Sequence, residues 1–148
     1  MDTRRISEEY TEIGYRLIDT MPELADIKNA DIQIMFLASE HEKKSSGKLV
    51  FGQCEKIADK YKWSIPCDFT ITIFEPNVVC FSEKQLEILI FHELLHVGLT
   101  PDGKFYVRPH DLEDFKVIVD RYGPRWADID TLTSYDESDI PEGTDDDE

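Results

Sequence analysis

The chain has 148 residues, 41% of them hydrophobic, and a formal net charge of −16. This length is close to the commonest size of a single domain, and the apolar fraction is sufficient for one core. The charge disfavours direct binding to nucleic acid, because phosphate groups would be repelled. No apolar run reaches the length of a membrane span, and the N-terminus leads into charged sequence rather than a signal peptide. We therefore expect a cytoplasmic protein with no membrane contact.

The acidic residues are concentrated at the C-terminus. Residues 127–148 contain ten acidic residues and no basic one. Such a segment has little apolar surface to bury, so we predict one folded domain over residues 1–126 and a solvated, disordered tail over residues 127–148. The partners of so acidic a chain are expected to be proteins, basic ones in particular.

The first half of the chain predicts one helix and two strands. Apolar residues recur at helical spacing over residues 7–21, which indicates an amphipathic helix. Residues 32–36 alternate in polarity like a strand, and residues 49–54 resemble a second strand. Residues 40–48 between them form a polar loop, in which His41 is expected to be solvated.

A third strand is predicted at residues 69–74, where large apolar residues alternate with Thr70 and Thr72. Two interpretations are open. The strand lies at an edge of the sheet, where Thr70 and Thr72 would help to bind an extended substrate through backbone hydrogen bonds. Alternatively, it is an interior strand with no direct contact to substrate.

A strongly apolar helix follows. Ser82 and Gln85 have the form of a capping box, which is a common start signal of a helix. Gly98 and Pro101 are the predicted stop signals. The apolar residues between these signals do not keep to one face, which indicates a helix that is buried on several sides.

The last turns of this helix carry an H-E-x-x-H motif, residues 92–96. Positions i and i+4 of a helix project from the same face, so His92 and His96 can bind one zinc ion. Glu93 would then lie beside the open position of the metal as a general base. The competing interpretation is a pair of core histidines. It would leave the Glu93 carboxylate buried and uncompensated in an apolar helix, which is costly.

A catalytic zinc site needs a third protein ligand. The spacing excludes the metzincin pattern, because Leu99 and Asp102 occupy the positions where that pattern has Gly and His. His110 is the best candidate, since neutral imidazole is a better zinc ligand than a carboxylate and Pro109 stiffens the approach to it. The competing ligands are Asp102, Asp111 and Glu113, of which Asp111 can instead be the N-cap of the next helix.

A final helix is predicted over residues 112–122, followed by a Gly-Pro stop. The order of elements indicates an α+β domain, in which a small mixed sheet packs against an N-terminal helix, the central motif helix and a C-terminal helix. The three cysteines, Cys54, Cys67 and Cys80, form no C-x-x-C pair, so we interpret them as reduced core thiols.

Four segments in order resemble the family of Putative phage metallopeptidases: CDFTITI at 67–73, HELLH at 92–96, HDLEDF at 110–115 and RYGPRW at 121–126. The resemblance runs from about residue 48 to residue 126. It implies a minimal zincin, similar in layout to the SprT/Spartan-type proteases, encoded by a phage or prophage. It also implies that His110 is the third ligand and Glu93 the general base.

These residues predict a zinc-dependent peptidase. Zinc would activate a water molecule, and Glu93 would pass the proton of that water to the leaving amine. Tyr106 and Arg108 are candidates for stabilising the oxyanion, although Arg108 can equally pair with a surface carboxylate. The alternative is a non-catalytic acidic protein or nucleic-acid mimic, which would bind a basic host protein and keep only a structural or relict metal site.

Overall fold

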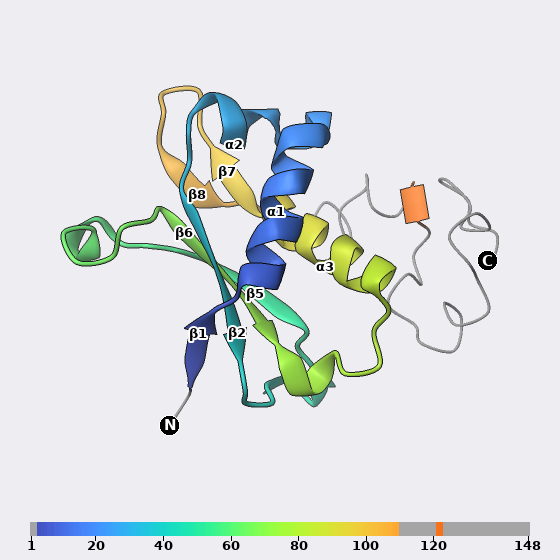
Figure 1. Ribbon diagram of the computed structural model, residues 1–148. Helices are drawn as coiled ribbons and strands as arrows, with labels where there is room; N and C mark the ends of the chain where they lie inside the picture. The colour runs from blue at the N-terminus through green and yellow to red at the C-terminus, as the bar shows by residue number, and fades with distance from the viewer. Residues whose placement is uncertain (1–2, 110–120, 123–148) are drawn as a thin grey trace.

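The computed structural model describes residues 3–109, 121 and 122 (Figure 1). In chain order, its helices and strands are β1 (Arg4–Ile6), α1 (Glu8–Thr20), α2 (Ala25–Asn29), β2 (Ile34–Ser39), β3 (Lys44–Ser45), β4 (Lys48–Leu49), β5 (Gly52–Lys56), β6 (Phe69–Phe74), α3 (Glu83–Leu95), β7 (Val97–Leu99) and β8 (Phe105–Val107). Short 3-10 turns lie at Pro22–Leu24, Asp59–Tyr61 and Glu75–Asn77. None of the described helices is long and apolar enough to cross a membrane.

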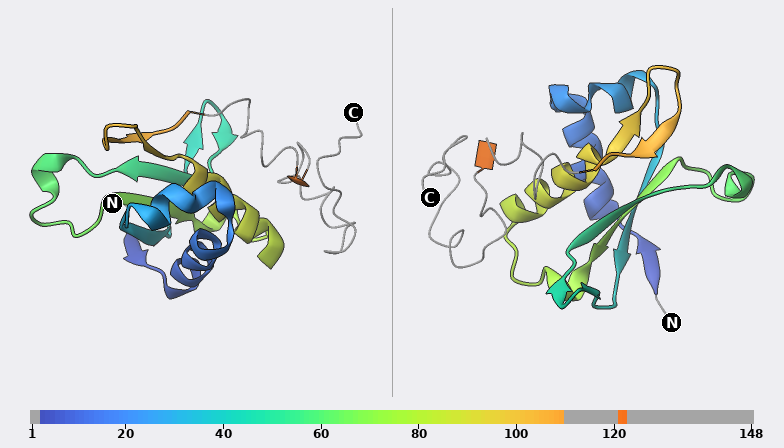
Figure 2. Two further views of the ribbon diagram at one scale, coloured as in Figure 1. Left: turned by 90° about the horizontal axis from the view of Figure 1, so that it is seen from above. Right: turned by 180° about the vertical axis from the view of Figure 1, so that it is seen from behind.

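Four strands form the main sheet in the order β1-β2-β6-β5. β2 and β6 run parallel, and the two outer pairs are antiparallel. The sheet is therefore small and mixed, as predicted. Helices α1 and α3 cover one of its faces (Figure 2). The core lies between them, where Phe36, Ile71 and Ile73 from the two central strands are almost fully buried.

Helix α1 forms where the apolar periodicity predicts it. Ser7 is its N-cap, and the Ser7 hydroxyl accepts a hydrogen bond of 3.1 Å from the Tyr10 backbone N–H. This bond satisfies one of the N–H groups that have no partner within the helix. The ring of Phe36 lies directly over Gly14, so that any Cβ at this position would overlap the ring. A glycine therefore lets α1 pack closely on β2.

Helix α3 begins with the predicted capping box, in which Ser82 and Gln85 each bond the other's backbone N–H. Eight of its thirteen residues are buried, including charged Glu93. The predicted helix buried on several sides is confirmed. Its end differs from the prediction: the helix stops at Leu95, and Gly98 belongs to the following strand β7.

The edge-strand interpretation of residues 69–74 is wrong. β6 lies between β2 and β5, and all six of its residues are buried. Thr70 and Thr72 face away from the helices, where the Arg4 side chain crosses the sheet and donates a hydrogen bond of 3.0 Å to the Thr72 hydroxyl. The Arg4 side chain thus lies over Thr72, which helps to explain why a fully buried strand keeps an amphipathic pattern. The strand at this edge of the sheet is β5.

Several smaller predictions also need correction. The polar loop at residues 40–48 contains the short hairpin β3–β4, although His41 in it is exposed as expected. The hairpin β7–β8 and the strand β1 were not predicted. The three cysteines are free thiols, but Cys80 is exposed and is not a core residue.

Most of the predicted C-terminal helix, and the whole tail, lie outside the described residues. Arg121 and Tyr122 are described, and both are helical. The Arg121 guanidinium lies 5.5 Å from the centre of the Phe91 ring and forms a 2.9 Å ion pair with Glu23. This end of the predicted helix therefore packs on α3.

Candidate metal centre

The two motif histidines lie together at the C-terminal end of α3. His92 is in the last turn, and His96 is the C-cap residue with near-helical backbone angles. Their ring centres are 5.2 Å apart and the ring planes meet at 71°. Both histidines are half-buried, whereas the residues between them are buried. The i, i+4 relation therefore brings the two imidazoles to one side of the helix, as the motif predicts.

A backbone carbonyl orients the second histidine. The His96 Nδ1 atom lies 2.6 Å from the carbonyl oxygen of Arg108. A carbonyl oxygen can only accept, so Nδ1 donates the hydrogen and Nε2 keeps its lone pair. Zinc-binding histidines are commonly fixed in this way, with one ring nitrogen donating to a carbonyl and the other left for the metal. The arrangement of His96 fits a zinc ion.

The hairpin β7–β8 places this carbonyl. The Arg108 N–H donates a 2.6 Å hydrogen bond to the carbonyl of His96, which extends the ladder of the hairpin by one residue. At the turn, Gly103 has a φ of +89°, a backbone conformation that favours glycine. After α3, the chain therefore turns back through this hairpin and returns to a position beside His96. His110 follows Arg108 by two residues.

The general-base candidate is held between α3 and β5. The Glu93 side chain is buried, with 5% of its surface exposed. A Cβ at Gly52 would lie 3.2 Å from the Glu93 carboxylate, so a larger residue there would require the carboxylate to shift by a few tenths of an ångström. Burial raises the pKa of the nearby Cys54 thiol, and the negative charge of Glu93 raises it further. This coupling agrees with a carboxylate that faces β5.

The predicted third ligand, His110, lies outside the described part of the chain. Among residues 3–109, 121 and 122, no group of three His, Cys, Asp or Glu side chains could hold a metal ion. His110, Asp111 and Glu113 are outside this set and stay predictions. Asp102 is described: it is exposed at the tip of the hairpin and accepts a hydrogen bond from Thr100. The base of the hairpin adjoins His96, so Asp102 lies at the wrong end to be the third ligand.

The two candidates for oxyanion stabilisation lie on or beside β8. The Tyr106 ring covers Gly98, where a Cβ would come within 2.6 Å of the ring. Arg108 is next to His96 through its backbone, and its side chain has no carboxylate partner among the described residues. The surface ion pair that we considered for Arg108 is therefore not formed with any of them. A role in the reaction stays a prediction for both residues.

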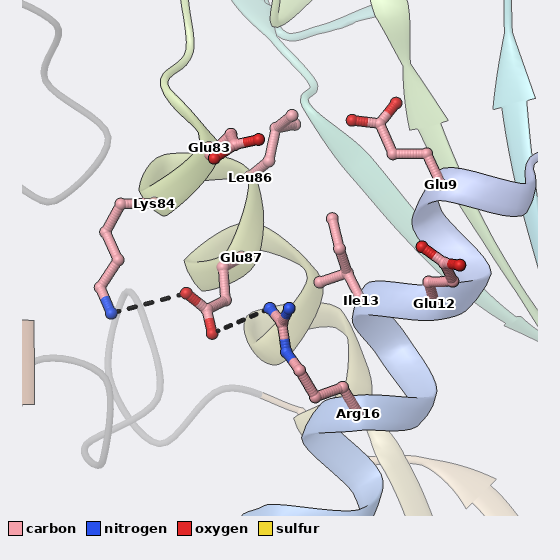
Figure 3. A pocket seen from close by; sticks show the side chains of 8 residues that line it. All are labelled: Glu9, Glu12, Ile13, Arg16, Glu83, Lys84, Leu86 and Glu87. Carbon is pink, nitrogen blue, oxygen red and sulfur yellow. Dashed lines mark hydrogen bonds and ion pairs between the residues drawn. The ribbon is translucent and has the colours of Figure 1, made fainter.

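The opposite side of α3 lines a different hollow (Figure 3). A polar groove of about 530 Å³ runs between α1 and α3. The Glu87 carboxylate in it forms ion pairs with Arg16 at 3.3 Å and with Lys84 at 3.5 Å. The groove is lined by Glu9, Glu12, Ile13, Arg16, Glu83, Lys84, Leu86 and Glu87.

Sequence reasoning missed two contributors to the site. The first is Gly52, whose signal is an isolated glycine at the start of a strand, a common mark of close approach. The second is the Arg108 carbonyl. Its signal is the sequence Pro101-Asp102-Gly103, a typical turn, which would have indicated that the chain folds back after α3.

The fold and the site define an α+β domain whose central helix carries an H-E-x-x-H motif. The chain belongs to the family described as Putative phage metallopeptidase, which matches residues 4–134. The match extends beyond the motifs at both ends, so our restriction of the resemblance to residues 48–126 was wrong. No curated protein and no solved structure matches the chain. The family description is that of a metal-dependent hydrolase of protein substrates, encoded by phages.

Proposed function

We propose that the protein is a zinc-dependent endopeptidase in which His92, His96 and His110 hold the metal and Glu93 is the general base. The observation that carries this proposal is the hydrogen bond from His96 Nδ1 to the Arg108 carbonyl, which makes Nε2 the ring nitrogen that would bind metal. A core histidine could form the same bond, so the assignment also draws support from His92, whose ring centre is 5.2 Å away, and from the buried carboxylate of Glu93.

His110 is the third ligand on grounds of chain position. The hydrogen bond from the Arg108 N–H to the His96 carbonyl closes the hairpin, so the hairpin ends beside the motif. Two residues of extended chain span about 7 Å, so its position in the sequence allows His110 to reach a metal held by the two motif histidines. Imidazole also suits zinc better than the carboxylates of Asp111 or Glu113.

Glu93 carries out the proton transfer. A bound zinc ion supplies a Lewis acid, which polarises the scissile carbonyl and lowers the pKa of water. Glu93 accepts the proton of the attacking water and delivers it to the amine that leaves. Its burial beside Gly52 limits the movement of the carboxylate, so little conformational freedom would be lost when the substrate binds. Tyr106 and Arg108 are the candidates for neutralising the oxyanion.

The substrate is a protein, bound in extended form along β5. Among the described residues, β5 pairs with β6 on one side and with no strand on the other. β8 lies near β5 without pairing with it, so the backbone groups on this side of β5 have no strand partner among the described residues, and an extended chain could form hydrogen bonds with them. Because Gly52 at the start of β5 touches Glu93, the scissile bond lies near that end of the strand. This assignment replaces the role that we first gave to Thr70 and Thr72.

The charge of the chain suggests the kind of target. A net charge of −16 favours basic protein substrates, such as basic host proteins in the cytosol of a phage-infected cell. The acidic residues 127–148 would contribute to this attraction without belonging to the catalytic domain.

The decisive experiment compares wild type with Glu93→Gln in the host. Both proteins are expressed at equal levels, and new N-termini of host proteins are identified by mass spectrometry. We expect zinc-dependent cleavage products with wild type alone. Equal biological effects of the two proteins, with no new N-termini, would exclude catalysis and favour the acidic binding protein.

The ligand assignment has its own test. Purified wild type should contain one zinc per chain, His110→Ala should lose it, and Asp102→Ala should keep it. A stoichiometric zinc in His110→Ala would contradict the third-ligand assignment and leave the rest of the proposal in place.

A further inference from the structure

The loop between β5 and β6, residues 57–68, projects from the body of the domain (Figures 1 and 2). It is nevertheless well held together. The Ile57 N–H donates a 2.9 Å hydrogen bond to the Asp68 carbonyl at its base, and the N–H groups of Ser64 and Ile65 both donate to the Tyr61 carbonyl near its tip. The shape of the loop is therefore fixed by its own backbone.

This ordered loop exposes two large aromatic side chains. Trp63 is 86% exposed and Tyr61 is 49% exposed. Tryptophan is buried to a high degree in most proteins, so an exposed one on an ordered loop is unusual. Trp and Tyr are also the residues that most often anchor a bound protein chain. The loop thus presents two large aromatic side chains to solvent, and the Lys60 ammonium lies 5.2 Å from the centre of the Tyr61 ring.

The loop is connected to the metal centre on one side through β8. The Lys62 ammonium of the loop lies 5.0 Å from the centre of the Phe105 ring, and Phe105 begins β8. Three residues further along, Arg108 bonds His96. Of the seven exposed large hydrophobic residues among those described, four lie on the loop or on β8: Tyr61, Trp63, Tyr106 and Val107.

On the other side, the loop continues β5. Gly52 at the start of this strand touches Glu93, and Ile57 at the base of the loop follows five residues later. Five residues of strand span about 17 Å. An extended chain that lies along β5, with its scissile bond beside Glu93, therefore reaches the loop after about five residues.

We propose that residues 57–68 are a substrate-recognition arm, in which Trp63 and Tyr61 bind a large apolar side chain of the protein substrate. This side chain lies about five to eight residues from the scissile bond, on the side that pairs with the C-terminal end of β5. The proposal rests on the proposed peptidase function. It makes the arm a determinant of which long substrates are cleaved, and gives it no part in the bond cleavage itself.

The test is cleavage of a peptide library prepared from host proteins, with products identified by mass spectrometry. Trp63→Ala is compared with wild type, and Val79→Ala is the matched control, because Val79 is 77% exposed but lies outside the loop and β8. Wild type and Val79→Ala should prefer aromatic or large aliphatic residues five to eight positions from the cleaved bond. Trp63→Ala should lose this preference.

Individual peptides make the comparison quantitative. For peptides long enough to reach the arm, Trp63→Ala should lower kcat/KM about tenfold or more, which is typical of a lost aromatic anchor. For peptides that end within three residues of the cleaved bond, Trp63→Ala and wild type should be equal. Equal cleavage of long peptides would overturn the proposal, as would a dimer of wild type that Trp63→Ala converts to monomers.

A binding measurement separates this proposal from the peptidase function. Immobilised Glu93→Gln captures peptides from the same library, and Glu93→Gln combined with Trp63→Ala is the comparison. If peptide capture depends on Trp63 but wild type hydrolyses no peptide, the peptidase function is excluded and the recognition role of the arm is supported. Hydrolysis that is independent of Trp63 would exclude the arm and keep the peptidase. Neither capture nor hydrolysis would overturn both.

Discussion

Two glutamates of α3 have opposite surroundings. Glu87 lies in the groove between α1 and α3, where Arg16 and Lys84 both pair with it (Figure 3). Glu93 is six residues further along, about 240° around the helix, so it projects from a different side. It is 5% exposed and lies against Gly52 of β5. One helix therefore presents the same side chain to two very different environments.

The difference bears on the role that we propose for Glu93. Arg16 and Lys84 neutralise the Glu87 carboxylate at the surface, where such ion pairs contribute about 1 kcal/mol or less to stability. Glu93 is placed by helix position and by a glycine in the facing strand, next to two histidines that suit a metal. The second arrangement suits the general-base role that we propose for Glu93.

The largest expected effect separates the two glutamates. Glu93→Gln keeps the size of the side chain and removes its basicity, so kcat/KM for peptide hydrolysis should fall about 100-fold or more. Zinc content should not change, since Glu93 is not a ligand. Glu87→Gln should hydrolyse peptides like wild type. A comparable loss in both variants would mean that the two sites are not functionally distinct.

The second effect concerns the metal and the fold. His96→Ala should lose zinc and unfold at a lower temperature than the zinc-loaded wild type, by on the order of 5 to 10 °C, because metal binding stabilises the folded state. His41→Ala is the control, since His41 is exposed in the β3–β4 region. A chelator should lower the melting temperature of wild type and His41→Ala, and leave that of His96→Ala unchanged. A chelator effect in His96→Ala would contradict its role as a ligand.

A third, smaller effect tests the glycine that faces Glu93. A Cβ in Gly52→Ala would lie 3.2 Å from the carboxylate, which must shift by a few tenths of an ångström. We expect a roughly tenfold loss of kcat/KM with full zinc content, because the position of a general base affects its rate strongly. Gly47→Ala is the control. Gly47 has a φ of +78° with open space around it, so the change should cost stability and spare activity.

Local signals predicted α1 and the start of α3, but neither the short helix α2 nor the end of α3. The boundaries of α1 and the start of α3 follow from apolar spacing and from the caps at Ser7 and Ser82, which act within a few residues. The position of β6 could not be read in this way. An interior strand normally has two apolar faces, but here Arg4, from another strand, covers the polar face, and that contact spans 68 residues of sequence.

The candidate site was likewise predictable only where its signals are local in sequence. The spacing of His92, Glu93 and His96 is local, and the structure brings the two imidazoles together as expected. The contact that orients His96 comes from a backbone carbonyl, which every residue has, so no side-chain pattern marks it. The approach of Gly52 to Glu93 depends on how β5 packs on α3, and a glycine alone does not specify its neighbour.

The smallest effect uses Cys54 to report on the charge of Glu93. Burial, and then the charges of Glu93 and Glu55, raise the pKa of this thiol, so less thiolate is present at a given pH. Since the thiolate is the reactive form, Cys54 should be alkylated more slowly than exposed Cys80, which peptide mapping resolves. Glu93→Gln removes one of the two charges and should speed alkylation of Cys54 modestly, because burial remains the main cause. Glu87→Gln should have no effect. Equal rates in wild type and Glu93→Gln would mean that the carboxylate does not face β5.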